Sequence, residues 1–262
     1  MLTRNLDKAR EAFKKKDIHE TRLAHSNKRA YEKHNQEQGK YIKSLIYGGL
    51  DGIITTFAAV AGVAGASLSA GVVLVMGFAN LIADGLSMSI GDYLSTKAEI
   101  EYKAKERERE TWEVEHYPEG EKQELIELYV NKGIEKEDAS TIANIISKNK
   151  KAWIDIMMVE ELGIIEEKES PIKNALVTFV SFIFFGIIPI LAYVFSMFIP
   201  ALTGISFITA CLLTALTLFI LGALKVKITG ENWILSGFEM LLVGGIAATS
   251  AYFVGVLLGK VI

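Results

Sequence analysis

Four glutamates near the middle of the chain have a spacing that could gather carboxylates at one place. They follow the pattern E-x2-E-x7-E-x2-E and are Glu110, Glu113, Glu121 and Glu124. The two members of each pair are three residues apart, so on a helix they share one face. Pro118 and Gly120 predict a bend between the pairs, and a tight reversal there would bring the four carboxylates together. At that distance they could not all stay ionised without a counter-cation, so the pattern indicates either protonated glutamates or a bound divalent metal ion.

Further side chains could complete such a metal site. Met157 and Glu161 are four residues apart and would share one face of a later helix. Oxygen ligands alone suit Mg2+, Ca2+ or Mn2+, whereas an added thioether moves the preference toward softer metals such as ferrous iron. His116 lies in the predicted bend and could contribute a nitrogen. The alternative is that the glutamates form a solvated helix surface paired with lysines and arginines, and that the methionine belongs to a core.

The apolar residues gather in stretches long enough to cross a membrane. Half of the 262 residues are hydrophobic, and no charged residue occurs between Asp51 and Asp84 or from Asn174 through Leu224. A helix needs about 20 apolar residues to cross the hydrocarbon core of a bilayer. We therefore predict an all-α membrane protein with five transmembrane helices. The predicted spans are 44–65, 71–94, 172–195, 201–224 and 234–257.

The charged residues predict the domain organisation and the orientation. Residues 1–44 hold 12 Lys/Arg and 6 Asp/Glu, whereas residues 97–173 hold 13 and 20. The short loops after the first and third spans carry no charge. Because lysine and arginine favour the cytoplasmic face, we expect the N-terminal arm and the acidic insert to be cytosolic. The predicted parts are a charged N-terminal arm (1–43), spans one and two (44–96), a cytosolic helical metal-binding insert (97–170) and spans three to five (171–262).

The insert is rich in Glu, Lys, Arg and Ala, a composition that favours helix. The second span should therefore continue as one long helix as far as Tyr117, because the residue before a proline avoids the α region. Further helices are expected at 118–131, 137–149 and 151–162. The N-terminal arm is expected to be an amphipathic segment that lies on the membrane or on the insert.

Polar groups inside the predicted spans are candidates for an ion path. Asp51 falls about two turns into the first span, and Met88 falls in the cytosolic half of the second. Antiparallel helices joined by a short turn would set these two residues at similar depth. An ionisable residue within a span is costly and by default faces a partner or a water-filled path. Asp84 and Asp92 also have structural explanations, namely a bond across helices for Asp84 and a position at the membrane interface for Asp92.

Over about residues 41–262 the chain resembles the vacuolar iron transporter family. The resemblance is carried by YGGLDGIITTFA, by ANLIADGLSMSIGDYLSTKAE, by the glutamate quartet and by AWIDIMMVEELG. It implies five transmembrane helices, a homodimer, and a cytosolic helical metal-binding domain between the second and third spans. It also implies transport of ferrous iron, and often manganese or other divalent ions, out of the cytosol in exchange for protons.

The resemblance assigns roles to particular residues of this chain. It implies a cytosolic metal site made of six residues: Glu110, Glu113, Glu121, Glu124, Met157 and Glu161. It also implies that Asp51 and Met88 line the translocation path at the dimer axis. Ser44 and Asn80 stand where some members of the family carry acidic residues, so the proton route and the ion preference stay open.

The expected function is that of a proton-coupled antiporter for Fe2+, with Mn2+ and other divalent ions as further candidate substrates. It would work in a vacuolar or other acidic organelle membrane, or in the plasma membrane of a prokaryote. One alternative is a membrane-anchored metal buffer or sensor that does not transport, against which Asp51 and Met88 argue. A second is a di-iron enzyme, but its Glu-x-x-His motif fits only once here, at Glu113 to His116. We expect no enzymatic activity, no prosthetic group and no nucleic-acid partner.

Overall fold

The computed structural model describes residues 11–13, 15–26, 36–165, 170–229 and 232–261, and the regular elements among them are helices. The all-α fold class predicted from the sequence is therefore confirmed. In chain order the helices are α2 (Ile18–Ser26), α3 (Gln36–Gly65), α4 (Ala70–His116), α5 (Pro118–Asn131), α6 (Lys136–Ile146), α7 (Lys150–Glu160), α8 (Pro171–Phe198), the short 3-10 helix η1 (Pro200–Ile205), α9 (Ser206–Thr229) and α10 (Trp233–Leu258).

Five of the described helical segments are long and apolar enough to cross a membrane, in agreement with the sequence. They are Lys43–Gly65, Ala70–His116, Pro171–Phe198, Pro200–Val226 and Trp233–Leu258. Large apolar side chains such as Phe184, Leu212 and Leu242 are exposed on the outer faces of these helices. In a soluble protein such a surface would be a liability, whereas in a bilayer it meets lipid tails. The chain is a multi-pass integral membrane protein.

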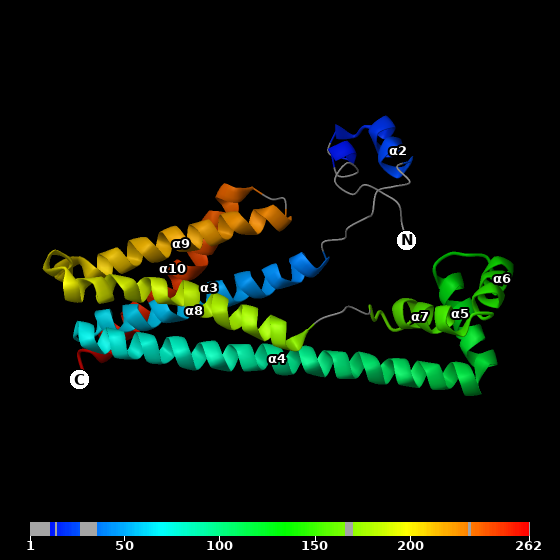
Figure 1. Cartoon of the computed structure of the whole chain (residues 1–262), viewed down its shortest axis with the longest axis horizontal. Coiled ribbons are helices and arrows are strands. Elements are labelled where there is room, and N and C mark those ends of the chain that lie inside the picture. The colour runs from blue at the N-terminus through cyan, green and yellow to red at the C-terminus, as the bar shows by residue number, and fades with distance from the viewer. Residues whose placement is uncertain (1–10, 14, 27–35, 166–169, 230–231, 262) are drawn as a thin grey trace. The chain divides into compact units, whose positions relative to one another are not determined.

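The chain divides into two compact units, residues 1–85 with 177–262, and residues 86–176. In the first unit α10 packs against α3 and α9, and α3 also packs against α9 (Figure 1). A Cβ atom on Gly52 would meet the backbone of Phe182, and one on Gly255 would meet the backbone of Gly62. The helices therefore approach to backbone contact, which small residues permit in membranes.

The second unit contains the charged end of α4 together with α5, α6 and α7. α4 runs without interruption to His116, and α5 begins directly afterwards with Pro118 in its first turn. Positive φ angles at Gly133 (92°) and Gly163 (65°) mark the chain reversals after α5 and α7. Glycine adopts this backbone region without a steric penalty, which explains why these helices end where the sequence predicts.

One insert helix is shorter than predicted. The sequence suggested a helix over 137–149, but α6 ends at Ile146. Asn149 instead caps the next helix, because its side chain accepts a hydrogen bond from the backbone N–H of Ala152 at 3.1 Å. An N-cap residue adopts an extended backbone, so Asn149 cannot also continue α6.

A compact apolar core holds the second unit together. It is built from buried residues of α4, α5, α6 and α7, including Leu125, Trp153 and Met157. Ion pairs join the helices around this core: Arg107 of α4 contacts Asp155 of α7, and Lys150 of α7 contacts Glu115 of α4. Burial of the aromatic and aliphatic side chains is the larger stabilising contribution, since exposed ion pairs each contribute about 1 kcal/mol or less.

Part of the N-terminal arm lies outside the described residues, including 1–10 and 27–35. Within the described part, Asp17 caps α2 by accepting backbone hydrogen bonds from His19 and Glu20 at 2.8 and 3.1 Å. The position of the arm on the membrane or on the insert stays a prediction.

Candidate metal centre

Three carboxylates from three different elements meet in the second unit. Glu110 lies on α4, Glu121 on α5, and Glu161 directly follows α7. One carboxylate oxygen from each residue lies within 4.8 Å of the others. Glu110 is completely buried, Glu121 is 4% exposed and Glu161 is exposed. We call Glu110, Glu121 and Glu161 the carboxylate triad.

The local fold explains how the triad assembles. The reversal between α4 and α5 takes only Tyr117, so the last turns of α4 and the first turn of α5 are close. Glu121 sits in that first turn of α5, where the positive end of the helix dipole favours a carboxylate. Glu161 ends α7, and its backbone N–H donates to the carbonyl of Met157 at 2.9 Å. Packing of α7 in the core therefore sets the position of Glu161.

The buried members of the triad lack hydrogen-bond partners. Neither carboxylate oxygen of Glu110 has a donor among the described residues, nor does Oε2 of Glu121. Burial and the negative charges of Glu110, Glu124 and Glu113 raise the pKa of Glu121 to about 8. Glu121 therefore keeps its proton to a higher pH than an ordinary glutamate.

The pKa of Glu161, the third member of the triad, is raised as well. Partial burial and the nearby charges of Glu110 and Glu124 raise the pKa of Glu161. Three oxygen donors with this excess negative charge suit a hard or borderline divalent cation. A cation would satisfy the unpaired oxygens of Glu110 and compete with the proton on Glu121.

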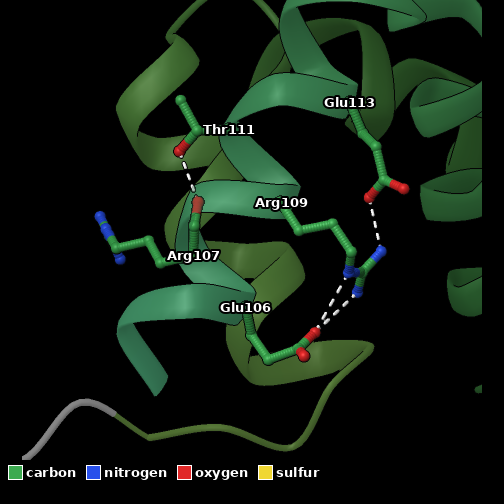
Figure 2. A network of polar contacts seen from close by, with 5 residues as sticks. All are labelled: Glu106, Arg107, Arg109, Thr111 and Glu113. Atoms are coloured by element: carbon green, nitrogen blue, oxygen red, sulfur yellow. Dashed lines mark hydrogen bonds and ion pairs between the residues drawn. The ribbon is translucent and has the colours of Figure 1, made fainter. Parts of the chain in front are cut away.

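The other two members of the quartet lie outside the triad. Glu113 forms an ion pair with Arg109, with 2.5 Å between Oε2 and Nη1 (Figure 2). Glu124 is exposed and acts on Glu121 and Glu161 through its charge. The structure thus brings together one glutamate from each sequence pair, rather than all four.

Met157 and His116 have other contacts in this structure. Met157 is completely buried in the apolar core, one turn before Glu161 on the same helix. The His116 ring stacks on Trp112 with 4.5 Å between centroids, and its Nδ1 lies 2.8 Å from the Trp112 carbonyl oxygen. His116 is therefore held against its own helix. A role for Met157 as a metal ligand stays a prediction.

The intramembrane residues fall on both sides of the division between the two units. Asp51 on α3 and Asp84 on α4 belong to the first unit, where both are half-buried and their charges interact. Met88 lies one turn after Asp84 on α4 and belongs to the second unit. The pairing of Asp51 with Met88 stays a prediction. The charge of Asp84, for which the sequence offered a structural explanation, acts on Asp51.

The raised pKa of Glu121 predicts how the stability of the metal-free protein depends on pH. The carboxyl has its ordinary pKa of 4.5 in the unfolded chain and about 8 in the folded protein. The folded state therefore binds the proton more tightly, so this group contributes most to stability below pH 4.5. The contribution is lost as the pH rises from 4.5 to about 8, by an amount on the order of a few kcal/mol.

Thermal unfolding in a metal chelator, followed by circular dichroism between pH 5 and 8.5, measures this loss. Glu121→Gln cannot ionise, so its unfolding temperature should fall less over the same range than that of the unsubstituted protein. Equal slopes for the two proteins would contradict the assignment.

Comparison with known proteins agrees with these features. The sequence profile of the VIT family matches residues 42–256. The "Vacuolar iron transporter" of Toxoplasma gondii is 42% identical over 272 aligned residues, which cover 99% of this chain and 90% of the relative. The protein of the same name from Plasmodium falciparum is 36% identical, covering 98% of each chain. "Vacuolar iron transporter 1" of Arabidopsis thaliana is 36% identical, covering 82% of this chain and 84% of the relative. Because the family profile spans most of the sequence and five helices can cross a membrane, the chain belongs to the VIT family.

Proposed function

We propose that this protein transports Fe2+ across a membrane in exchange for protons, with Mn2+ and other divalent ions as further candidate substrates. The names of its relatives support a metal transporter that acts on iron. The observation that carries the proposal is Glu110, a completely buried carboxylate with no donor for either oxygen among the described residues. An uncompensated buried charge is costly, so the site is suited to receive a cation.

In the proposed mechanism, the insert at 97–170 faces the cytosol and captures the ion. The triad supplies three carboxylate oxygens, while Glu113, Glu124 and Met157 are the further candidate ligands. Capture displaces a proton from Glu121, since metal and proton compete for the same oxygens. The charge of the ion then offsets the repulsion between the carboxylates.

The ion next enters the membrane part of the protein. Asp51 and Met88 are proposed to line the path, and Asp84 joins them because its charge acts on Asp51. In the proposed homodimer these residues lie near the shared axis. An acidic lumen would favour release, because protonation of Asp51 removes the charge that holds the ion. The direction of net transport is then from the cytosol to a vacuolar or similar acidic lumen.

A membrane-anchored metal buffer or sensor would need the triad but no acidic residues within the spans. The two acidic residues Asp51 and Asp84 within the spans therefore favour transport, since ionisable groups in a span are costly and are typical of ion paths.

Reconstitution of the full chain into liposomes loaded with a metal-sensitive dye distinguishes the two functions. We expect uptake of Fe2+, and of Mn2+, Co2+ or Zn2+ where the site accepts them, at rates well above those of protein-free liposomes. Binding of metal without uptake would support the buffer and contradict the transporter.

A further inference from the structure

The side chain of Arg109 bridges two glutamates on its own helix, beside the carboxylate triad. Its Nη1 lies 2.5 Å from Oε2 of Glu113, one turn later on α4. Its Nε and Nη2 each lie 3.1 Å from Oε2 of Glu106, one turn earlier (Figure 2). The guanidinium is therefore held by two carboxylates at once, and one of them belongs to the glutamate quartet.

The charge of Arg109 also reaches the triad. Arg109 directly precedes Glu110, and its charge acts on both Glu110 and Glu161 with the sign opposite to that of the surrounding carboxylates. The other ion pairs that the structure describes on the charged part of α4 involve different carboxylates. These pairs are Lys97 with Glu101, Lys103 with Glu99, Lys105 with Glu108, Arg107 with Asp155, and Lys150 with Glu115.

We infer that Arg109 is a built-in counter-cation that limits how tightly the triad holds a divalent ion, by repelling the ion and by competing with it for Glu113. This inference rests on the proposed function and adds a residue that sets the affinity of its loading site. A divalent ion that takes Oε2 of Glu113 as a ligand must displace the guanidinium from that oxygen. Two contacts to Glu106 remain available to the released guanidinium, so the exchange leaves no arginine unpaired.

Such a residue suits a site that must pass its ion onward. A cluster of carboxylates with no nearby cation would bind a divalent ion tightly and release it slowly. A fixed positive charge beside the triad opposes the bound ion by Coulomb repulsion, which is appreciable because the site is partly shielded from solvent. Arg109 thereby lowers the affinity of the triad for the divalent ion and speeds the release of that ion.

The test measures Mn2+ affinity of the full-length protein in detergent by titration calorimetry. Arg109→Gln removes the charge but keeps a polar side chain of similar reach, and we expect the Kd for Mn2+ to fall about tenfold. Arg109→Lys keeps the charge and should stay within about threefold of the unsubstituted protein. The matched control is Lys105→Gln, which removes a charge from the exposed pair with Glu108 on the same helix and should leave the Kd unchanged.

A purely structural role predicts a different result. If Arg109 only stabilised the helix, Arg109→Gln would weaken Mn2+ binding or leave it unchanged, and either result would overturn the inference. In a Glu113→Gln background the gain from Arg109→Gln should shrink to less than about threefold. A full tenfold gain in that background would overturn the competition for Glu113.

Transport supplies a second readout. In proteoliposomes Arg109→Gln should lower both the half-saturating Mn2+ concentration and the maximal rate, because tighter binding slows release. An unchanged maximal rate together with tighter binding would contradict the role of Arg109 in release.

If the unsubstituted protein bound no Mn2+ at all, the proposed loading site itself would be wrong, and the inference about Arg109 would be wrong as well. If the unsubstituted protein binds Mn2+ and the Arg109→Gln variant binds it no more tightly, only the role of Arg109 is wrong and the proposed loading site stands.

Discussion

Replacing Asp51 with asparagine is expected to abolish metal uptake by the reconstituted protein while leaving metal binding by the triad intact. Asparagine has nearly the same volume as aspartate but carries no charge. It therefore cannot stabilise a cation inside the membrane, and it cannot bind a proton when the cation leaves. Asp51 lies in the unit formed by 1–85 and 177–262, and the triad lies in the other unit, so their effects should separate. We expect at least a hundredfold loss of Fe2+ uptake rate, measured in dye-loaded proteoliposomes.

The matched control is Glu239→Gln on α10. Glu239 is also an acidic residue of a membrane-spanning helix, but it is exposed and forms an ion pair with Lys225 at 3.0 Å. We expect this variant to retain uptake within about threefold. If the Asp51→Asn variant took up Fe2+ as fast as the Glu239→Gln control, Asp51 would not be part of the translocation path.

The double substitution Glu110→Gln with Glu121→Gln is expected to weaken metal binding at least a hundredfold and, at the same time, to stabilise the metal-free protein. The two buried carboxylates repel each other and lack donors, whereas two amides can donate to and accept from each other. Removal of this unfavourable interaction should raise the stability of the metal-free protein at pH 8 by about 1–3 kcal/mol. Calorimetric titration with Mn2+ and thermal unfolding in a chelator measure the two effects.

Glu119→Gln provides the control for this pair. Glu119 is exposed in the same first turn of α5 and is not part of the triad, so its substitution should change neither quantity appreciably. A double variant that loses stability in parallel with metal affinity would indicate that the carboxylates serve the fold rather than the ion.

Much of the fold could be predicted from the sequence because its signals are local. A stretch without charge identifies a membrane span wherever it occurs, and the five candidate spans start and end within a few residues of the predicted limits, except that α4 continues as far as His116. Pro118, Gly133 and Gly163 determine the helix ends in the insert through their own backbone preferences. The length of α4 followed from its helix-favouring composition and the proline at 118.

The site was harder to predict because it depends on tertiary packing. The i,i+3 spacing correctly put Glu110 and Glu113 on one helix, but it could not show that Arg109 would hold Glu113 and leave Glu110 in the triad. The arginine lies four residues before Glu113 and three after Glu106, so the signal for that pairing was present in the sequence. By contrast, the meeting of Glu161 with Glu110 depends on how α7 packs in the apolar core, which no local spacing reveals.

Simultaneous measurement of Fe2+ uptake and proton movement in proteoliposomes with an acidic interior tests the central claim most directly. The proposed mechanism predicts that Fe2+ enters only with the full-length protein and that the interior becomes more alkaline as it enters. A protonophore added beforehand collapses the pH gradient, so it should slow Fe2+ uptake and abolish the alkalinisation that depends on Fe2+. Folded protein that binds Fe2+ but leaves both the interior metal concentration and the interior pH unchanged would contradict it.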